Sequence, residues 1–217
     1  MVEQELFDNR FTESVVADAV LRLFDADGTI YLTTGYFTWS GYLTIRDALI
    51  EFLARDPDNE VYVVVATGAD QLSRLVVEAC WELADADRVH LLTYHDGFIH
   101  PKLYLRDGPD PALVTGSANL TWDGLGKNLE LAWYYAPDSR DDEIFRTHRD
   151  WLDRFLEECD PITSADLSRR TRLRRTLRTW TNKGRINLPT MLKSALPFSE
   201  YFVRESSPYE AATEDEG

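Results

Sequence analysis

The chain has 217 residues, of which 44% are hydrophobic and 28% charged, and its formal net charge is −15. This length and apolar content suffice to bury the core of one domain with a short appendage, and they exclude a chain that is disordered throughout. The negative charge argues against a nucleic-acid partner, because binding to phosphates is driven by Lys and Arg side chains that release counterions.

Apolar runs of strand length alternate with segments of helical periodicity along most of the chain. We expect strands at Thr29–Tyr36, Glu60–Ala66, Val89–Tyr94, Lys102–Arg106, Ala112–Thr115 and Asn128–Tyr135. We expect helices at Glu13–Phe24, Tyr42–Arg55, Ala69–Leu83 and Asp141–Cys159. In the second helix, the spacing of Leu43, Ile45, Ala48, Leu49 and Phe52 predicts a face that packs on a sheet. The alternation predicts an α/β layer structure.

The charge of the chain is distributed unevenly. Residues 1–160 hold 13 basic and 31 acidic residues, whereas residues 161–217 hold 10 basic and 7 acidic residues. We therefore expect a main domain over residues 1–160 and a separate basic helical extension over residues 161–217. Its acidic end, residues 210–217, is expected to be disordered.

Cysteine content and hydropathy indicate the compartment. Cys80 and Cys159 each lie in an apolar, helix-like stretch, where a buried free thiol is the common finding. We find no run of about 18 apolar residues and no basic-then-apolar start, so we expect neither a membrane span nor a signal peptide, and a cytoplasmic location.

The low lysine content weakens the argument that the negative charge excludes a nucleic-acid partner. Four lysines stand against 38 acidic residues, a bias that we associate with a cytoplasm of very high salt. There the Debye length falls to roughly 3 Å or less, so that a negative surface repels a polyanion weakly. The alternative is an acidic protein from a low-salt cytoplasm.

Polar residues flank a predicted hairpin. His100 and Lys102 come just before Leu103–Arg106, and Gly116, Ser117 and Asn119 come just after Ala112–Thr115, so a hairpin of these two segments brings an imidazole, an ammonium, a hydroxyl and a carboxamide together. These groups include one nucleophile or base and three groups able to hold phosphate oxygens. They suffice for phosphoryl chemistry without a metal.

The spacing of these residues resembles the signature of the phospholipase D superfamily. The resemblance is carried by His100-Pro101-Lys102, Asp107, Gly116-Ser117-Ala118-Asn119 and Asn128-Leu129-Glu130. The eight residues between Asp107 and Gly116 exceed the usual six, and the turn that holds Pro109 and Pro111 can absorb them. The resemblance implies a mixed β-sheet between helices, and a site that uses neither a metal nor another cofactor.

The resemblance also implies a role for each motif residue. His100 would attack phosphorus and form a phosphohistidine, while Lys102 and Asn119 would bind the nonbridging oxygens with help from Ser117. Glu130 resembles the acid that hydrogen-bonds a histidine in this family. Asp107 would support the hairpin.

The chemistry of the family needs two histidines that face one phosphate, and this chain has one motif. His90, His95 and His148 are not followed by Lys at the second position, and we expect His148 on a solvated helix face. Single-motif members pair two chains about a two-fold axis, which implies a symmetric homodimer with a composite site. Trp122 could stack on a base, although a place in the core is favoured.

A cluster of arginines marks the extension. Six of them are Arg169, Arg170, Arg172, Arg174, Arg175 and Arg178, with no acidic residue among them. Their side chains would either clamp a nucleic-acid backbone or pair with the acidic main domain or a second subunit. The sequence does not decide between these.

The pattern as a whole favours a metal-independent endonuclease that acts on DNA or RNA through a phosphohistidine. A phospholipid hydrolase or transferase would use the same residues but would be expected to need an apolar membrane-facing surface. A non-catalytic nucleic-acid-binding dimer is the third alternative.

Overall fold

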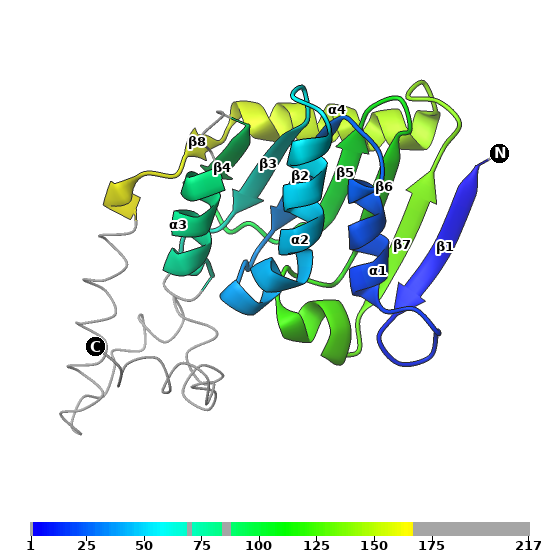
Figure 1. Cartoon of the computed structure of the whole chain (residues 1–217), viewed down its shortest axis with the longest axis horizontal. Helices are drawn as coiled ribbons and strands as arrows, with labels where there is room; N and C mark the ends of the chain where they lie inside the picture. The colour runs from blue at the N-terminus through cyan, green and yellow to red at the C-terminus, as the bar shows by residue number, and fades with distance from the viewer. Residues whose placement is uncertain (1, 69–70, 84–87, 167–217) are drawn as a thin grey trace. The chain divides into compact units, whose positions relative to one another are not determined.

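The computed structural model describes residues 2–68, 71–83 and 88–166. These residues form a mixed α/β structure with an eight-stranded sheet between helices, as predicted (Figure 1). The strands are β1 (Glu3–Asp8), β2 (Thr29–Thr34), β3 (Glu60–Val65), β4 (Val89–Thr93), β5 (Leu103–Asp107), β6 (Ala112–Gly116), β7 (Leu131–Ala136) and β8 (Asp160–Pro161). Their order across the sheet is β1-β7-β6-β5-β2-β3-β4-β8.

The sheet is mixed, with three adjacent parallel strands and antiparallel pairing elsewhere. Strands β2, β3 and β4 run parallel, whereas β5 pairs antiparallel with both β2 and β6. The parallel strands are joined by helices, as a parallel connection requires. Ile30 and Leu32 of β2 face one side of the sheet and Tyr31 faces the other, and all three are buried.

Helices cover both faces of the sheet (Figure 1). One face carries α1 (Val16–Leu21), η1 (Arg22–Phe24), α2 (Trp39–Arg55) and α3 (Arg74–Leu83), and the other carries α4 (Glu143–Glu157). The larger core lies on the first face and includes Phe24, Leu32 and Phe52. The smaller core lies under α4 and includes Phe145 and Leu152. Burial of each such side chain stabilises the fold by roughly 1.5–3 kcal/mol.

Several helices and strands begin later than predicted. At most of these positions, loop backbone or side chains make the hydrogen bonds that a longer element would have made. Helix α3 begins at Arg74 rather than Ala69, because Gln71 and Ser73 hydrogen-bond to the backbone of Phe37. Helix α4 begins after Asp142, whose carboxylate accepts the backbone N–H groups of the first turn. Strand β7 begins at Leu131 rather than Asn128.

Three short elements were not predicted. Strand β1 carries mostly polar side chains and lies at the edge of the sheet, where one apolar face suffices. Strand β8 has two residues, and a π-helical turn, η2, spans Asp123–Lys127. The prediction that Leu43 faces the sheet was wrong, because its side chain is exposed on α2.

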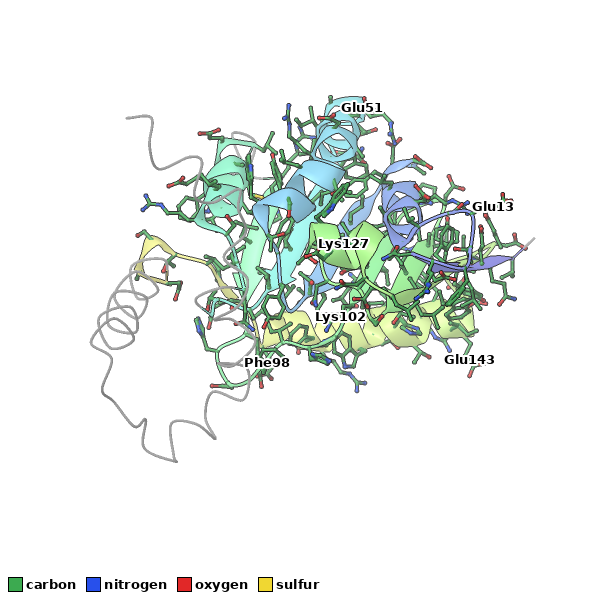
Figure 2. The ribbon with its side chains drawn as sticks, turned by 90° about the horizontal axis from the view of Figure 1, so that it is seen from below. Glu13, Glu51, Phe98, Lys102, Lys127 and Glu143 are labelled. Atoms are coloured by element: carbon green, nitrogen blue, oxygen red, sulfur yellow. The ribbon has the colours of Figure 1, made fainter. Side chains whose placement is uncertain are left out.

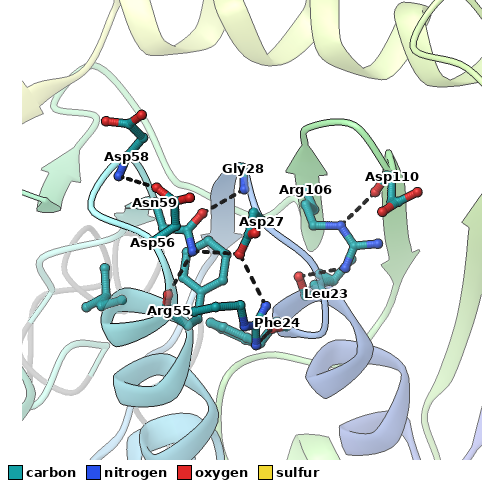
Figure 3. A network of polar contacts seen from close by, with 12 residues as sticks. Leu23, Phe24, Asp27, Gly28, Arg55, Asp56, Asp58, Asn59, Arg106 and Asp110 are labelled. Atoms are coloured by element: carbon teal, nitrogen blue, oxygen red, sulfur yellow. Dashed lines mark hydrogen bonds and ion pairs between the residues drawn. The ribbon is translucent and has the colours of Figure 1, made fainter.

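A polar network holds the loops at one end of the sheet (Figure 3). The side chain of Asn59 donates to the carbonyl of Phe52 (2.8 Å) and accepts the N–H of Gly28 (2.8 Å). Gly28 has a φ of 141°, a conformation that side chains with a Cβ rarely adopt. Buried Arg106 donates from Nη1 to the carbonyl oxygens of Arg22 and Leu23. These bonds anchor β5 at the end where Asp107 lies.

The predicted extension falls largely outside the described residues. Arg169, Arg170, Arg172, Arg174, Arg175 and Arg178 all lie beyond residue 166, so their roles stay predictions. Within the ranges that the structure describes, no helix has the length and apolar character needed to cross a membrane.

Candidate active site

The β5–β6 hairpin gathers the motif residues. Leu103 pairs with Thr115 in the antiparallel register, so the residues that precede β5 and those that follow β6 lie at the same end of the hairpin. The N–H of Gly116 donates to the carbonyl of Lys102 (3.3 Å), which continues the pairing by one step. A Cβ at Gly116 would collide with the carbonyl of Leu131, so close pairing of β6 with β7 requires glycine there.

An open cavity of about 640 Å³ lies at this end of the hairpin. Its lining includes His100, Lys102, Ser117 and Asn119, the four residues predicted to act on phosphate. Helix α4 contributes His148 and Trp151 to the same cavity. Figure 2 shows Lys102 and Phe98 on the side of the molecule along which α4 runs.

Lys102 is packed against His100. Its ammonium nitrogen donates to the carbonyl of His100 (2.6 Å) and lies 3.2 Å from the Nδ1 atom of the same residue. The side chain is buried, and burial lowers the pKa of Lys102 while the nearby carboxylate of Glu130 opposes this shift. An ammonium can only donate, so a charged Lys102 leaves Nδ1 of a neutral His100 as acceptor and the ring proton on Nε2.

Ser117 links the site to β7. Its hydroxyl donates to Oε2 of Glu130 and accepts the N–H of Leu131 (3.1 Å). Glu130 is thus hydrogen-bonded to Ser117 and not to a histidine, the partner that the resemblance led us to expect. Glu130 therefore fixes the hydroxyl proton of Ser117 and leaves the cavity face of that oxygen as an acceptor.

Asn119 is oriented by backbone and hydroxyl donors. Its Oδ1 atom accepts from Oγ1 of Thr34 and from the N–H of Gly35, both at 3.2 Å. Because the amide of Gly35 can only donate, the carboxamide atom that faces it is the oxygen. The NH₂ group, on the other branch of the carboxamide, is then available as a donor to the cavity that Asn119 lines.

Asp107 lies at the opposite end of β5 from the cavity. Its carboxylate pairs with Arg140 (2.6 Å) and with Nε of Arg149 on α4 (2.9 Å). Arg149 also lies over the ring of Tyr31, 4.5 Å from its centroid. These contacts join the hairpin to α4.

Two cavity residues escaped the sequence analysis. His148 was expected on a solvated helix face, and it is half-buried in the structure, where it lines the open cavity together with Trp151. Their spacing of three residues on a predicted helix was an available signal, since such residues share a face. Trp122, for which a place in the core was favoured, is instead 59% exposed.

The described residues contain no group of three or more His, Cys, Asp or Glu side chains placed to hold a metal ion. Cys80 is buried and Cys159 is partly buried, and both are free thiols.

Comparisons with known proteins identify the architecture. NucT from Helicobacter pylori has a TM-score of 0.57 at 15% identity, over 75% of this chain and 100% of its own. Nuc from Salmonella typhimurium, a phospholipase D family member, has a TM-score of 0.57 at 22% identity, over 76% of this chain and 100% of its own. Phosphatidylserine synthase from Haemophilus influenzae has a TM-score of 0.58 at 12% identity, over 84% of this chain and 46% of its own.

The sequence comparisons add the family. No curated protein sequence matches the chain significantly. The family model described as "Cardiolipin synthase, PLD-like domain" matches residues 21–155, which is more than half of the chain. With this match, and with the same fold in the solved structures, the chain belongs to the phospholipase D-like family.

Proposed function

We propose that the chain is a metal-independent phosphodiesterase that cleaves nucleic acid through a phosphohistidine on His100. The observation that carries the proposal is the convergence of His100, Lys102, Ser117 and Asn119 on one cavity. His100 offers the nucleophile, and Lys102 and Asn119 offer donors to the phosphate oxygens, which is the set that phosphoryl transfer without a metal needs.

In the first step, Nε2 of His100 attacks phosphorus and the bond to the leaving oxygen breaks. The attack requires the proton of a neutral imidazole to lie on Nδ1. In the free protein the Lys102 ammonium lies 3.2 Å from Nδ1 and the ring proton is therefore on Nε2. As substrate binds, the ammonium must turn toward a phosphate oxygen and the ring proton must move from Nε2 to Nδ1. Asn119 donates to a second nonbridging oxygen, and both contacts strengthen as negative charge accumulates on these oxygens.

A second imidazole gives its proton to the leaving oxygen and then takes one from water. The oxygen of that water attacks the phosphohistidine and releases His100. We assign the second imidazole to His100 of a second copy of the chain, in a symmetric homodimer. Exposed apolar side chains at the edge of the site support this, since Leu129 (63% exposed) and Leu131 (55%) flank Glu130.

Nucleic acid is favoured as substrate by the exposed aromatic side chains at the site, because nucleobases stack on aromatic rings. The likeness to a phosphatidylserine synthase keeps phospholipid as the second candidate. The negative charge of the chain does not oppose the first candidate at high salt, where screening is strong. The arginine cluster beyond residue 166 is proposed to contact either the nucleic-acid backbone or the acidic main domain.

The test is cleavage of single- and double-stranded DNA and RNA in molar potassium chloride with EDTA. Wild type is expected to cleave, and His100→Ala to lose activity by at least a thousandfold. His90→Ala is the matched control, because His90 lies on β4 and stacks on Tyr62, away from the cavity lining. Loss of activity in EDTA, or full activity of His100→Ala, would overturn the proposal. Cleavage of phospholipid but of no nucleic acid would favour the second candidate.

A further inference from the structure

Helix α4 builds an aromatic wall of the cavity. His148 and Trp151 lie three residues apart on one face of the helix, and both line the cavity that holds His100 and Lys102. Among the described residues that line it, none is an Asp or Glu, in a chain whose net charge is −15. The cavity thus combines cationic and aromatic groups in an otherwise acidic protein.

One face of the Trp151 indole packs on a neighbouring aromatic ring, and the other face is exposed. Its indole stacks on Phe155 with ring centroids 5.2 Å apart and an interplanar angle of 24°. Phe155 in turn packs against Tyr94, at 5.6 Å. Trp151 nevertheless remains 42% exposed, so a supported aromatic surface faces outward beside the site.

His148 is held in one orientation. Its Nδ1 atom lies 2.8 Å from the carbonyl oxygen of Ile144, one turn earlier in α4. A carbonyl can only accept, so Nδ1 carries a proton and Nε2 is the acceptor of the neutral ring. Nε2 lies on the side of the ring away from this carbonyl.

The helix itself is fixed to the sheet. Buried Phe145 and Leu152 pack on the smaller core, and Arg149 pairs with Asp107 of β5. Since Arg149 lies between His148 and Trp151 in the sequence, the ion pair anchors the segment that carries both. Such a wall is preorganised, and a ligand that stacks on it loses little free energy in ordering the protein.

We propose that His148 and Trp151 form a subsite for an unpaired nucleobase beside the scissile phosphate, which selects single-stranded nucleic acid. This subsite rests on the proposed nuclease function and specifies its substrate class as single-stranded nucleic acid. Trp151 stacks on the base, and Nε2 of His148 accepts a hydrogen bond from the base edge. A base inside a duplex has both faces covered by its neighbours, so only an unpaired or extruded base can occupy the subsite.

The experiment compares a single-stranded oligonucleotide with the same strand carrying an abasic residue beside the cleaved phosphate, and with its duplex. The proteins are wild type, Trp151→Ala, Trp151→Phe and Trp81→Ala. Trp81 is the matched control, because it is 41% exposed on α3 and does not line the cavity. Cleavage is measured as kcat/KM, and binding as the Kd of each strand for the same proteins in the His100→Ala background. Melting temperatures report on folding.

Wild type is expected to prefer the intact strand over the abasic strand and the duplex by roughly tenfold or more. Trp151→Ala is expected to reduce this preference to near unity, whereas Trp151→Phe and Trp81→Ala keep most of it. A preference that survives in Trp151→Ala, or an equal loss on intact and abasic strands, would overturn the subsite.

The failure of the subsite and that of the nuclease are distinguishable. Cleavage by wild type without any dependence on the base contradicts only the subsite. The absence of cleavage on every strand contradicts the proposed function, and the base dependence of the Kd values then decides the subsite by the same criterion.

Discussion

The phenol of Tyr104 donates a 2.6 Å hydrogen bond to the carbonyl oxygen of Ala118. Ala118 lies between Ser117 and Asn119, and Tyr104 is fully buried in β5, so one strand of the hairpin holds the loop that follows the other. Burial raises the pKa of Tyr104, which keeps the phenol protonated and able to donate throughout the working pH range.

Tyr104→Phe is therefore expected to disturb the site without repacking the core. The ring is retained, but the carbonyl of Ala118 loses its buried donor, which costs about 1–3 kcal/mol of stability. Because the loop positions Asn119, we expect kcat to fall by roughly tenfold with a smaller change in KM. Urea unfolding and steady-state kinetics measure the two effects. Unchanged stability and kinetics would show that the bond does not position the loop.

Asp107→Asn tests the link between the hairpin and α4. The change removes the charge that pairs with Arg140 and Arg149, at a cost of about 2 kcal/mol for charge-assisted hydrogen bonds. We expect faster hydrogen exchange in α4 and weaker binding of single strands, because His148 and Trp151 lose their fixed position. Asp153→Asn is a matched control, since it pairs with Arg149 from the more exposed side. An equal effect of both changes would argue against a special role of Asp107.

Lys102→Met is expected to abolish activity while stabilising the fold by on the order of 1 kcal/mol, because a charge that is buried for function costs stability. Burial lowers the folded-state pKa of Lys102, so the charged form is disfavoured in the native state. This penalty is fully present below the folded-state pKa and disappears as the pH rises toward the ordinary lysine pKa of about 10.4.

The stability difference between Lys102→Met and wild type should therefore be largest near pH 7 and shrink as the pH rises toward 10. Thermal unfolding at a series of pH values measures it. A difference that grows with pH would mean that the native state favours the charged form of Lys102.

The two thiols should differ in reactivity. Burial raises the pKa of Cys80 to about 12 and that of Cys159 to about 11, so little of either is thiolate at neutral pH. We expect iodoacetamide to label Cys159 slowly and Cys80 only after unfolding, with the rate at Cys159 rising as the pH approaches 11. Mass spectrometry of timed digests measures both. Rapid labelling of native Cys80 would contradict its burial.

The sequence predicted the residues of the motif better than their contacts. The spacing of His100, Lys102, Ser117 and Asn119 around a hairpin sufficed to place them together, because antiparallel pairing brings the hairpin ends to one place. Strand β1 was missed because an edge strand needs few apolar residues. The bond of Glu130 to Ser117 depends on the course of the backbone between η2 and β7, which periodicity does not encode.

Residues that reach the site through tertiary packing were the hardest to predict. His148 lies on a helix with charged neighbours, which is typical of a solvated face, and only the docking of α4 beside the hairpin brings it to the cavity. Trp122 is exposed although its size favours burial. Both depend on how elements distant in sequence pack, and a single sequence carries little of that information.

The proposed mechanism depends on a covalent bond between His100 and phosphorus. Wild type should be mixed with an oligonucleotide labelled at its phosphates, quenched in base after a fraction of a turnover, digested and sequenced by mass spectrometry. We expect an acid-labile, base-stable phosphoryl group on the peptide that contains His100, and none in His100→Ala. Steady cleavage with no label on that peptide, or with label on another residue, would contradict this mechanism.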